Sequence, residues 1–216
     1  MAEFVSRAGH KLEHALATFG IDVTARVCAD LGSNTGGFTD CMLRRGAAKV
    51  YAIDTGYGVL DWKLRKDPRV VVMERTNAMH ATLPEPVSLV TIDVAWTKQR
   101  HILPAARRMI SSDGQVVTLI KPHYEAPPAL LRHGVLPSDQ LDAVVESVLP
   151  HLQAAGFEVL GMTLSPIKGA KGNAEFLAHL RPSRAHEQDP HFIRVADREG
   201  AAPLYPEDTA SPSPGS

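Results

Sequence analysis

The chain has 216 residues, a hydrophobic fraction of 44% and a formal net charge of −1, which suits one domain that buries a sheet between two helical layers. This charge lacks the positive excess common in nucleic-acid-binding domains, although residues 1–110 carry more basic than acidic side chains and would supply any phosphate-facing surface. The two cysteines have no CxxC spacing and no run of eighteen apolar residues occurs, so we expect a cytoplasmic protein without disulfides, structural zinc or a membrane span.

The first half of the sequence predicts alternating helices and strands. An opening helix is capped by Ser6 and stopped by Gly20, with its apolar residues on one face. A second helix runs from about Phe38 to Gly46. The predicted strands are 27–31, 50–53, 70–73, 89–92 and 116–120, with helices between most of them. This alternation is typical of an α/β domain with a mainly parallel sheet.

The second half predicts how the sheet is completed. A helix spans 137–155, and two strands, 157–164 and 174–180, flank the segment SPIKGAKGN, whose length and glycines suit a hairpin. The last strand should therefore run antiparallel in a seven-stranded sheet. Such a Rossmann-like sheet is the class I methyltransferase variant of the doubly wound fold. We expect the domain to cover residues 1–181, and residues 182–216, which contain several prolines, to be mostly disordered.

A glycine-rich loop follows the first predicted strand. Asp30 ends this strand, and the loop then reads Gly32, Ser33, Asn34, Thr35, Gly36, Gly37 and Phe38. Small residues let backbone N–H groups approach a ligand where parallel strands end. The GxGxxG spacing of dinucleotide sites is absent, which disfavours a nicotinamide-dependent oxidoreductase. The acidic residue before the glycines suits the ammonium group of S-adenosylmethionine better than a pyrophosphate.

Two further residues extend this predicted cofactor site. Asp54 ends the second strand, where a carboxylate can accept both hydrogen bonds of a ribose diol. Asn77 follows the third strand and could contact the adenine edge. The alternative is a plain glycine turn, with Asp30 as a helix cap, Asp54 as a solvated strand end and Asn77 as an ordinary loop residue.

Charged residues also follow the fourth and fifth strands. Asp93 and Lys121 lie at carboxyl ends of strands, where α/β domains place their sites. Lys11 in the first helix and Glu175 in the last strand could reach the same cleft. Taken singly, each has an ordinary alternative as a surface or strand-end residue.

The sequence resembles the FtsJ/TlyA type of ribose 2′-O-methyltransferase over nearly all of residues 5–180. The matching pieces are SRAGHKL, DLGSNTGGFTD, RGAAKVYAIDTGYG, DPRVVVMERTNA, TIDV, LIKPHYE, GVL, SPIKGAKGN and AEF. The resemblance implies methyl transfer by a tetrad of Lys11, Asp93, Lys121 and Glu175. Lys121 is then the candidate base: an amine can draw off a hydroxyl proton when partial burial and a nearby cation, here Lys11, favour its neutral form. Asp93 and Glu175 would position the lysines and hold water or the cofactor, so Asp93 is also a predicted cofactor-binding residue.

The sequence departs from TlyA-like proteins in two places. The segment after Asp93 reads VAWTKQR where TlyA-like proteins have VSFISL, and few residues precede Ser6, where an S4-type RNA-binding domain is usual. RNA capture, most simply of ribosomal RNA, would then depend on a partner or on basic residues of the domain: Arg44, Arg45, Lys49, Lys63, Arg65, Lys66, Lys98 and Arg100. The alternatives are a methyltransferase for a small molecule or a protein, and a catalytically silent nucleotide- or RNA-binding module.

Overall fold

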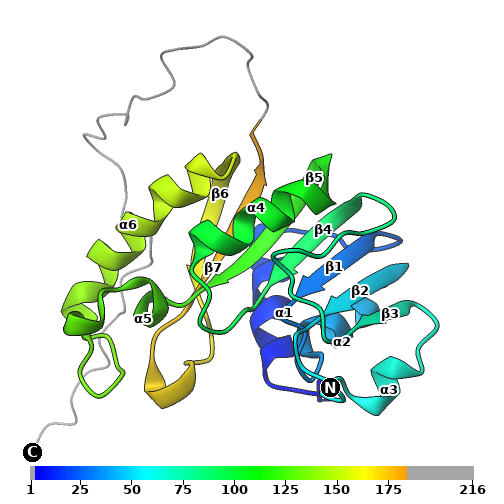
Figure 1. Ribbon diagram of the computed structural model, residues 1–216, viewed down its shortest axis with the longest axis horizontal. Coiled ribbons are helices and arrows are strands. Elements are labelled where there is room, and N and C mark those ends of the chain that lie inside the picture. The colour runs from blue at the N-terminus through cyan, green and yellow to red at the C-terminus, as the bar shows by residue number, and fades with distance from the viewer. Residues whose placement is uncertain (1–2, 184–216) are drawn as a thin grey trace, which may run out of the picture. The chain divides into compact units, whose positions relative to one another are not determined.

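The apolar runs of the sequence pair into one seven-stranded sheet in the computed structural model, which describes residues 3–183 (Figure 1). The strands are β1 Val27–Leu31, β2 Lys49–Ile53, β3 Val70–Met73, β4 Val87–Ile92, β5 Ile110–Ile120, β6 Phe157–Leu164 and β7 Phe176–Pro182. Their order in the sheet is β3-β2-β1-β4-β5-β7-β6. The first five strands in this order, β3, β2, β1, β4 and β5, run parallel to one another, and β7 is antiparallel to both of its neighbours, β5 and β6. The predicted class I methyltransferase fold is confirmed.

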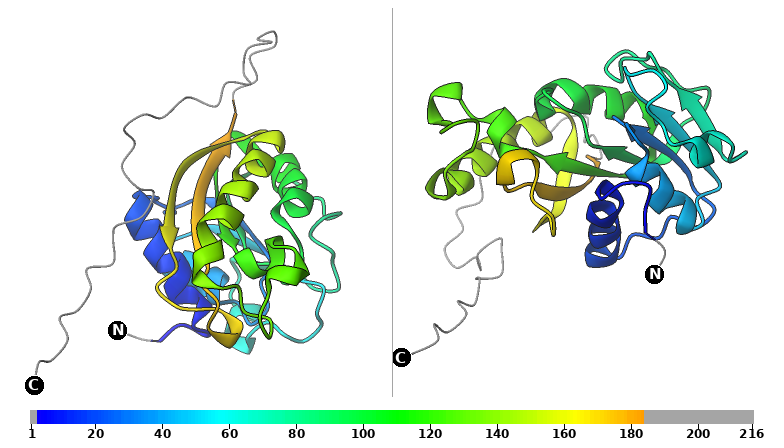
Figure 2. Two further views of the ribbon diagram at one scale, coloured as in Figure 1. Left: turned by 90° about the vertical axis from the view of Figure 1, so that its left-hand side faces the viewer. Right: turned by 90° about the horizontal axis from the view of Figure 1, so that it is seen from below.

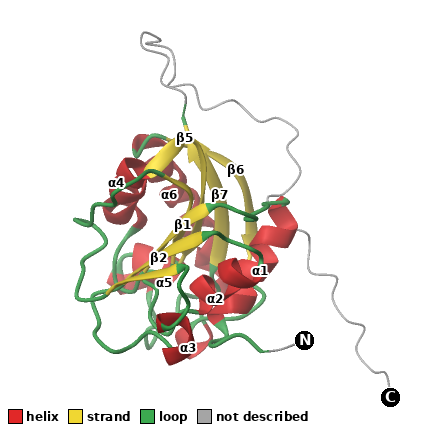
Figure 3. Cartoon of the chain, turned by 90° about the vertical axis from the view of Figure 1, so that its right-hand side faces the viewer, coloured by secondary structure: helices red, strands yellow, loops and turns green. Residues whose placement is uncertain are grey.

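Helices cover both faces of this sheet (Figures 2 and 3). The helices are α1 Ala8–Phe19, α2 Gly37–Arg44, α3 Trp62–Arg65, α4 Gln99–Met109, α5 Pro122–Glu125 and α6 Leu141–Ala154, with 3₁₀ turns at Pro128–Leu130, Ser138–Gln140 and Ala170–Gly172. Helices α1 and α2 pack on one face, α4 and α6 cover the other, and α5 packs on α6. Burial of apolar side chains against both faces explains why β1 and β4 read as nearly continuous apolar runs.

Several boundaries differ from the expectation: β2, β4 and β5 begin one, two and six residues earlier than predicted, and α2 ends at Arg44. Ser6 does not cap α1, because Arg7 is the N-cap residue and makes no side-chain cap bond. The predicted helix 137–155 is a 3₁₀ turn, Ser138–Gln140, followed by α6. Glu175 lies just before β7 rather than inside it. The last strand continues through Pro182, one residue past the predicted domain end, and the proposed tail beyond Ser183 lies outside the described residues.

Candidate active site

Strand pairing brings the predicted catalytic residues to one edge of the sheet. Leu31 of β1 pairs with Ile92 of β4, so the residues that follow them, Gly32 and Asp93, are neighbours. Ile120 of β5 pairs with Phe176 of antiparallel β7, which sets Lys121 opposite Glu175. The antiparallel direction of β7 is therefore what carries Glu175 to the carboxyl ends of the parallel strands.

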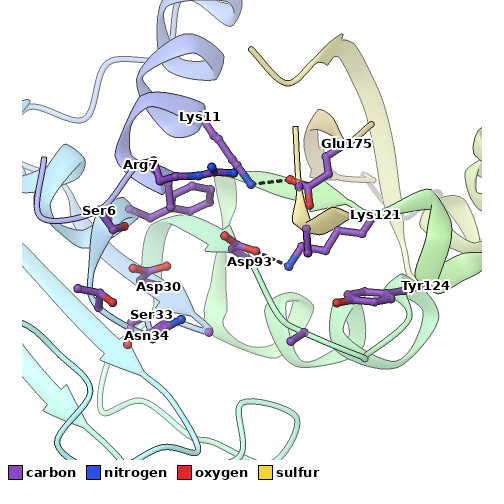
Figure 4. Close-up of a pocket in the computed structure, with 18 of the residues that line it drawn as sticks. Ser6, Arg7, Lys11, Asp30, Ser33, Asn34, Asp93, Lys121, Tyr124 and Glu175 are labelled. Atoms are coloured by element: carbon purple, nitrogen blue, oxygen red, sulfur yellow. Dashed lines mark hydrogen bonds and ion pairs between the residues drawn. The ribbon is translucent and has the colours of Figure 1, made fainter. Parts of the chain in front are cut away.

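The four predicted catalytic side chains form two ion pairs (Figure 4). Lys11 Nζ lies 2.5 Å from Glu175 Oε2, and Lys121 Nζ lies 2.6 Å from Asp93 Oδ1. Lys11 and Glu175 are buried, whereas Lys121 and Asp93 keep a little more exposure. Lys121 also donates to the carbonyl oxygen of Val94 at 3.1 Å. Each lysine thus pairs with its own carboxylate. The charge of Lys11 is compensated by Glu175, so Lys11 is not an unpaired cation beside Lys121.

The hairpin loop between β6 and β7 holds Glu175 in place. The Glu175 carbonyl accepts a hydrogen bond from the Ser165 backbone N–H at 2.8 Å, which closes the hairpin. Gly169 faces the carboxylate so closely that a Cβ there would lie 2.0 Å from Glu175 Oε1. Arg7 reaches across from the start of α1 and donates to the Lys168 carbonyl oxygen at 2.7 Å. Helix α1 and this loop are therefore tied together at two points, Arg7 and Lys11.

Both ion pairs and the glycine loop open into one cavity of about 300 Å³. From the predicted sites it is lined by Lys11, Asp30, Gly32, Ser33, Asn34, Thr35, Gly37, Phe38, Asp93, Lys121 and Glu175. It is also lined by residues that the sequence analysis did not select: Ser6, Arg7, Ala8, Ala95, His123, Tyr124, Gly169 and Ala170. No spacing rule singles these out, because they come from loops and helix ends that only the tertiary fold brings together.

Glycine at position 32 is required by the close approach of two strand ends. Gly32 has φ of +86°, and a Cβ there would lie 2.6 Å from the Asp93 carbonyl oxygen. Only glycine accepts this conformation and contact without a shift of the backbone. The same contact keeps the glycine loop directly beside Asp93, so the cofactor loop and the Lys121–Asp93 pair share one wall of the cavity.

Asp30 lies fully buried beneath the glycine loop. Its two carboxylate oxygens accept hydrogen bonds from Thr39 Oγ1 at 2.7 Å and Thr91 Oγ1 at 3.0 Å. Burial raises the pKa of Asp30 to about 7, against the lowering effect of the two threonine hydroxyls. A cation bound in the cavity above it would favour the ionised carboxylate.

The remaining predicted cofactor residues lie outside the cavity lining. Gly36, with φ of +101°, is the N-cap of α2 and faces Leu60 and Leu64. Asp54 is half-buried and accepts N–H bonds from Asn34 at 2.9 Å and Gly56 at 2.7 Å, one on each carboxylate oxygen.

Asp54 thus braces the glycine loop, and its oxygens keep lone pairs for a ribose. Asn77 is exposed, and its side-chain oxygen accepts the Met79 N–H in a local turn. The predicted adenine contact of Asn77 therefore receives no support from its position.

Aromatic side chains stand at the mouth of the cavity. Trp96 is 83% exposed, has φ of +61°, and stacks on Tyr124 with ring centroids 4.9 Å apart. His123, next in the chain to Tyr124, is buried, and burial and the nearby Lys121 lower its pKa, so it is neutral at pH 7. Trp96 belongs to the segment after Asp93 in which the sequence departs from the TlyA pattern, whereas His123 and Tyr124 lie in the matching piece LIKPHYE.

Within residues 3–183, no helix is long and apolar enough to cross a membrane. No group of three or more His, Cys, Asp or Glu side chains in that range is arranged to hold a metal ion. Both cysteines are buried and unpaired.

Comparison with known proteins decides the family. The model of the FtsJ-like methyltransferases matches residues 4–182. The chain belongs to the FtsJ-like methyltransferase family. This FtsJ-like chain is 44% identical over 184 residues to the 16S/23S rRNA (cytidine-2′-O)-methyltransferase TlyA of Mycobacterium tuberculosis, covering 82% of the chain and 68% of TlyA. It is 42% identical over 186 residues to YqxC of Bacillus subtilis, a proposed rRNA methyltransferase, covering 82% of the chain. It spans 65% of the length of YqxC.

Solved structures agree with this assignment. A proposed hemolysin from Lactococcus lactis superposes with a TM-score of 0.80 at 42% identity, covering 83% of this chain and 89% of that one. An S-adenosylmethionine-dependent methyltransferase from Mesorhizobium loti shares the fold alone, with a TM-score of 0.58 at 18% identity, covering 78% of this chain and 96% of that one. Because the chain belongs to the FtsJ-like methyltransferase family, its cofactor is S-adenosyl-L-methionine.

Proposed function

We propose that this FtsJ-like chain methylates a ribose 2′-hydroxyl of RNA, with ribosomal RNA as the substrate. The observation that carries the proposal is the pairing of two lysines with two carboxylates in the cavity that the glycine loop also lines. A ribose hydroxyl is a weak nucleophile, so its methylation requires a group that removes a proton and groups that fix the oxygen in line with the methyl carbon. Both requirements have candidates here.

The residues of the cavity and of the loops beside it suit the charge and the hydrogen-bonding groups of S-adenosylmethionine. The backbone of the loop from Gly32 to Gly37 would hold the cofactor, Asp30 would lie beneath its ammonium group, and Asp54 would accept hydrogen bonds from its ribose. When bound, the cofactor supplies an activated methyl group on a positively charged sulfur. Because this group is already activated, we infer that alignment and proton removal are the tasks left to the protein.

Lys121 is the proposed base. As a neutral amine, Lys121 would accept the proton of the 2′-hydroxyl as that oxygen is methylated. The ammonium group that results is the species that Asp93 stabilises at 2.6 Å. Asp93 and the Val94 carbonyl also fix the position of Nζ before the reaction.

Lys11 and Glu175 are proposed as positioning residues. Their buried pair closes the side of the cavity opposite the glycine loop and ties α1 to the loop before β7. Removing one partner of a buried pair leaves an uncompensated charge, which usually disturbs a site more than removing both. The stacked Trp96 and Tyr124 would form the wall against which the target nucleoside is placed.

The substrate is inferred from the relatives. TlyA of Mycobacterium tuberculosis is named for cytidine-2′-O methylation of 16S and 23S rRNA, and the Lys–Asp–Lys–Glu arrangement explains how such a hydroxyl would be activated. A ribosomal substrate would also place the enzyme in the cytoplasm. A methyltransferase for a small molecule or a protein is the alternative that the nearly neutral charge leaves open.

The test is transfer of labelled methyl groups from S-adenosylmethionine to ribosomal subunits from a strain that lacks the gene. We expect Lys121→Ala to bind the cofactor normally and to lose at least about a hundredfold in kcat, within the usual range for an acid–base group. Arg181→Ala is the control, because Arg181 is an exposed cation that pairs with Glu158 at the end of β7 far from the cavity and does not line it. Full activity of Lys121→Ala would refute the assignment of the base, and cofactor binding by an enzyme that labels no RNA would favour the small-molecule or protein alternative.

A further inference from the structure

Two exposed aromatic rings lie beside the cofactor site, each with a cation against one face. Tyr57 is 71% exposed with the Arg75 guanidinium 4.1 Å from its ring centroid, and Trp62 is 66% exposed with Lys66 Nζ at 4.7 Å. Lys63 follows Trp62 in α3 and is also exposed. We call these five residues the aromatic–cation surface. Exposed aromatic rings beside cations are the groups on which single-stranded nucleic acids stack their bases and with which they pair their phosphates.

The loop that carries Tyr57 is held rigidly from below. The Glu74 carboxylate accepts backbone N–H bonds from Gly58 at 3.0 Å, Val59 at 3.1 Å and Leu60 at 3.4 Å, and it pairs with Arg65. The Arg65 guanidinium and these N–H groups lower the pKa of Glu74 to about 2, so this anchor stays ionised at neutral pH. The exposed position of Tyr57 is therefore built into the fold, and ordering it costs little on binding.

Lys63 and Lys66 have no carboxylate partner within the described residues, unlike four of the other basic residues predicted for RNA capture. Four of those residues are paired with carboxylates: Arg44 with Asp40, Arg45 with Glu13, Lys49 with Glu85 and Arg65 with Glu74. Lys49 also begins β2 and so lies at the edge of the sheet opposite the cavity. Lys63 and Lys66 take part in no ion pair formed within residues 3–183. Their charge is available to a phosphate.

The surface adjoins the cofactor loop directly. The Asp61 N–H donates to the Thr35 carbonyl oxygen at 3.0 Å, and Leu60 and Leu64 pack against Gly36. Asp54 joins the two loops by accepting from Asn34 and Gly56. Thr35 and Asn34 line the cavity, so the aromatic–cation surface lies at the same edge of the sheet as the two ion pairs.

We propose that Tyr57 and Trp62 stack on unpaired bases of the RNA substrate while Lys63 and Lys66 contact its phosphates. This inference builds on the proposed RNA methylation and names the part of the chain that receives the strand beside the target nucleotide. Unpaired RNA is the partner that fits, because bases stack on aromatic faces without sequence preference and phosphates seek exposed cations. The cation on one face of each ring leaves the other face open, as the high exposure of both rings shows.

The test uses the two tryptophans as probes in the full chain. In a Trp96→Phe background, Trp62 is the only tryptophan, and its fluorescence reports stacking of a twelve-nucleotide unstructured RNA of mixed sequence. In the wild-type background, Trp62→Leu and Tyr57→Leu remove a ring, and the matched controls Trp62→Phe and Tyr57→Phe keep one. Cofactor affinity, thermal melting and the kcat and KM for ribosomal subunits are measured for each.

We expect RNA to quench Trp62, and each leucine variant to raise the RNA Kd and the KM about tenfold, with kcat and cofactor affinity unchanged. The phenylalanine controls should stay within about twofold of wild type. Lys66→Gln should reduce the slope of log Kd against log salt by about one phosphate contact.

Unchanged RNA affinity in the leucine variants would overturn the proposal. A fall in cofactor affinity that matches the loss of RNA binding would also overturn it, because the surface would then serve the cofactor loop. The wild type could fail to methylate ribosomal RNA while the short RNA still quenches Trp62 and the leucine variants lose affinity for that RNA. In that case the stacking surface stands and the proposed reaction fails. The two inferences can therefore fail separately.

Discussion

Replacing Asp30 with asparagine removes a buried carboxylate that lowers the free energy of unfolding when no cofactor is bound. Burial raises its pKa from 3.8 to about 7. Below pH 3.8 the folded and unfolded states are both protonated at this group. As the pH rises from about 4 to 7, the unfolded chain ionises first and the folded state loses stability, and above about pH 7 the loss is complete. About three pKa units correspond to about 4 kcal/mol at the upper end of this range.

Asp30→Asn should therefore be more stable than the wild type without cofactor, and the difference should grow by about 3 kcal/mol between pH 5 and pH 8. Urea unfolding at these two pH values measures it. Asp113→Asn, which changes an exposed carboxylate at the opposite end of β5, is the control for the change in net charge. Saturating S-adenosylmethionine should raise the melting temperature of the wild type at pH 8 far more than that of Asp30→Asn, because the ionised carboxylate stabilises the bound ammonium.

A difference in stability that is the same at pH 5 and pH 8 would refute the buried, proton-binding role of Asp30. Equal stabilisation of both proteins by the cofactor would refute its contribution to cofactor binding. The Thr39 and Thr91 hydroxyls can rotate to bond an amide, so the variant keeps the local packing that the test needs.

Two other substitutions and one chemical labelling experiment have expected outcomes. Glu175→Gln should lower kcat about tenfold or more with little change in cofactor Kd, because it leaves the buried Lys11 without its partner. Labelled-methyl kinetics measure kcat and isothermal titration measures cofactor Kd. A loss of cofactor affinity at unchanged kcat would contradict this role. Gly169→Ala should reduce activity to a similar degree, because its methyl group would displace Glu175 Oε1, and an active variant with an unchanged melting temperature would contradict this contact. Burial raises the pKa of the Cys28 thiol to about 12, and Cys41 is buried too. Neither thiol should therefore react with a thiol reagent at pH 8 until the chain is unfolded. Rapid labelling of the native protein would contradict their burial.

The strands and the glycine loop were predictable because their signals are local. Apolar runs marked β1 and β3 to the residue, and the hairpin length gave the antiparallel direction of the last strand. Strand ends alone selected Asp93 and Lys121. Lys11 and Glu175 needed the family resemblance, because a lysine on a helix and a glutamate near a strand carry no spacing signal of their own.

Other features depended on tertiary contacts that no local pattern encodes. The pairing of each lysine with its own carboxylate follows from the register of β5 and β7 and the packing of α1. The mouth of the cavity, with Trp96 on Tyr124, depends on a left-handed residue in a loop. Asn77 was selected by its place after a strand, but a local turn occupies its side-chain oxygen. Side chains at strand ends are predictable only where the strand itself points them to the site.

The most direct test is to find where the transferred methyl group sits on the RNA. Ribosomal RNA labelled by the wild-type enzyme would be hydrolysed with alkali, digested to nucleosides and analysed by mass spectrometry. Methylation of a 2′-hydroxyl predicts one alkali-resistant linkage and a nucleoside with the added methyl on its ribose, absent when Lys121→Ala is used. A methyl group found on a base, or label found only in protein or small molecules, would contradict the proposed chemistry of the two lysine–carboxylate pairs.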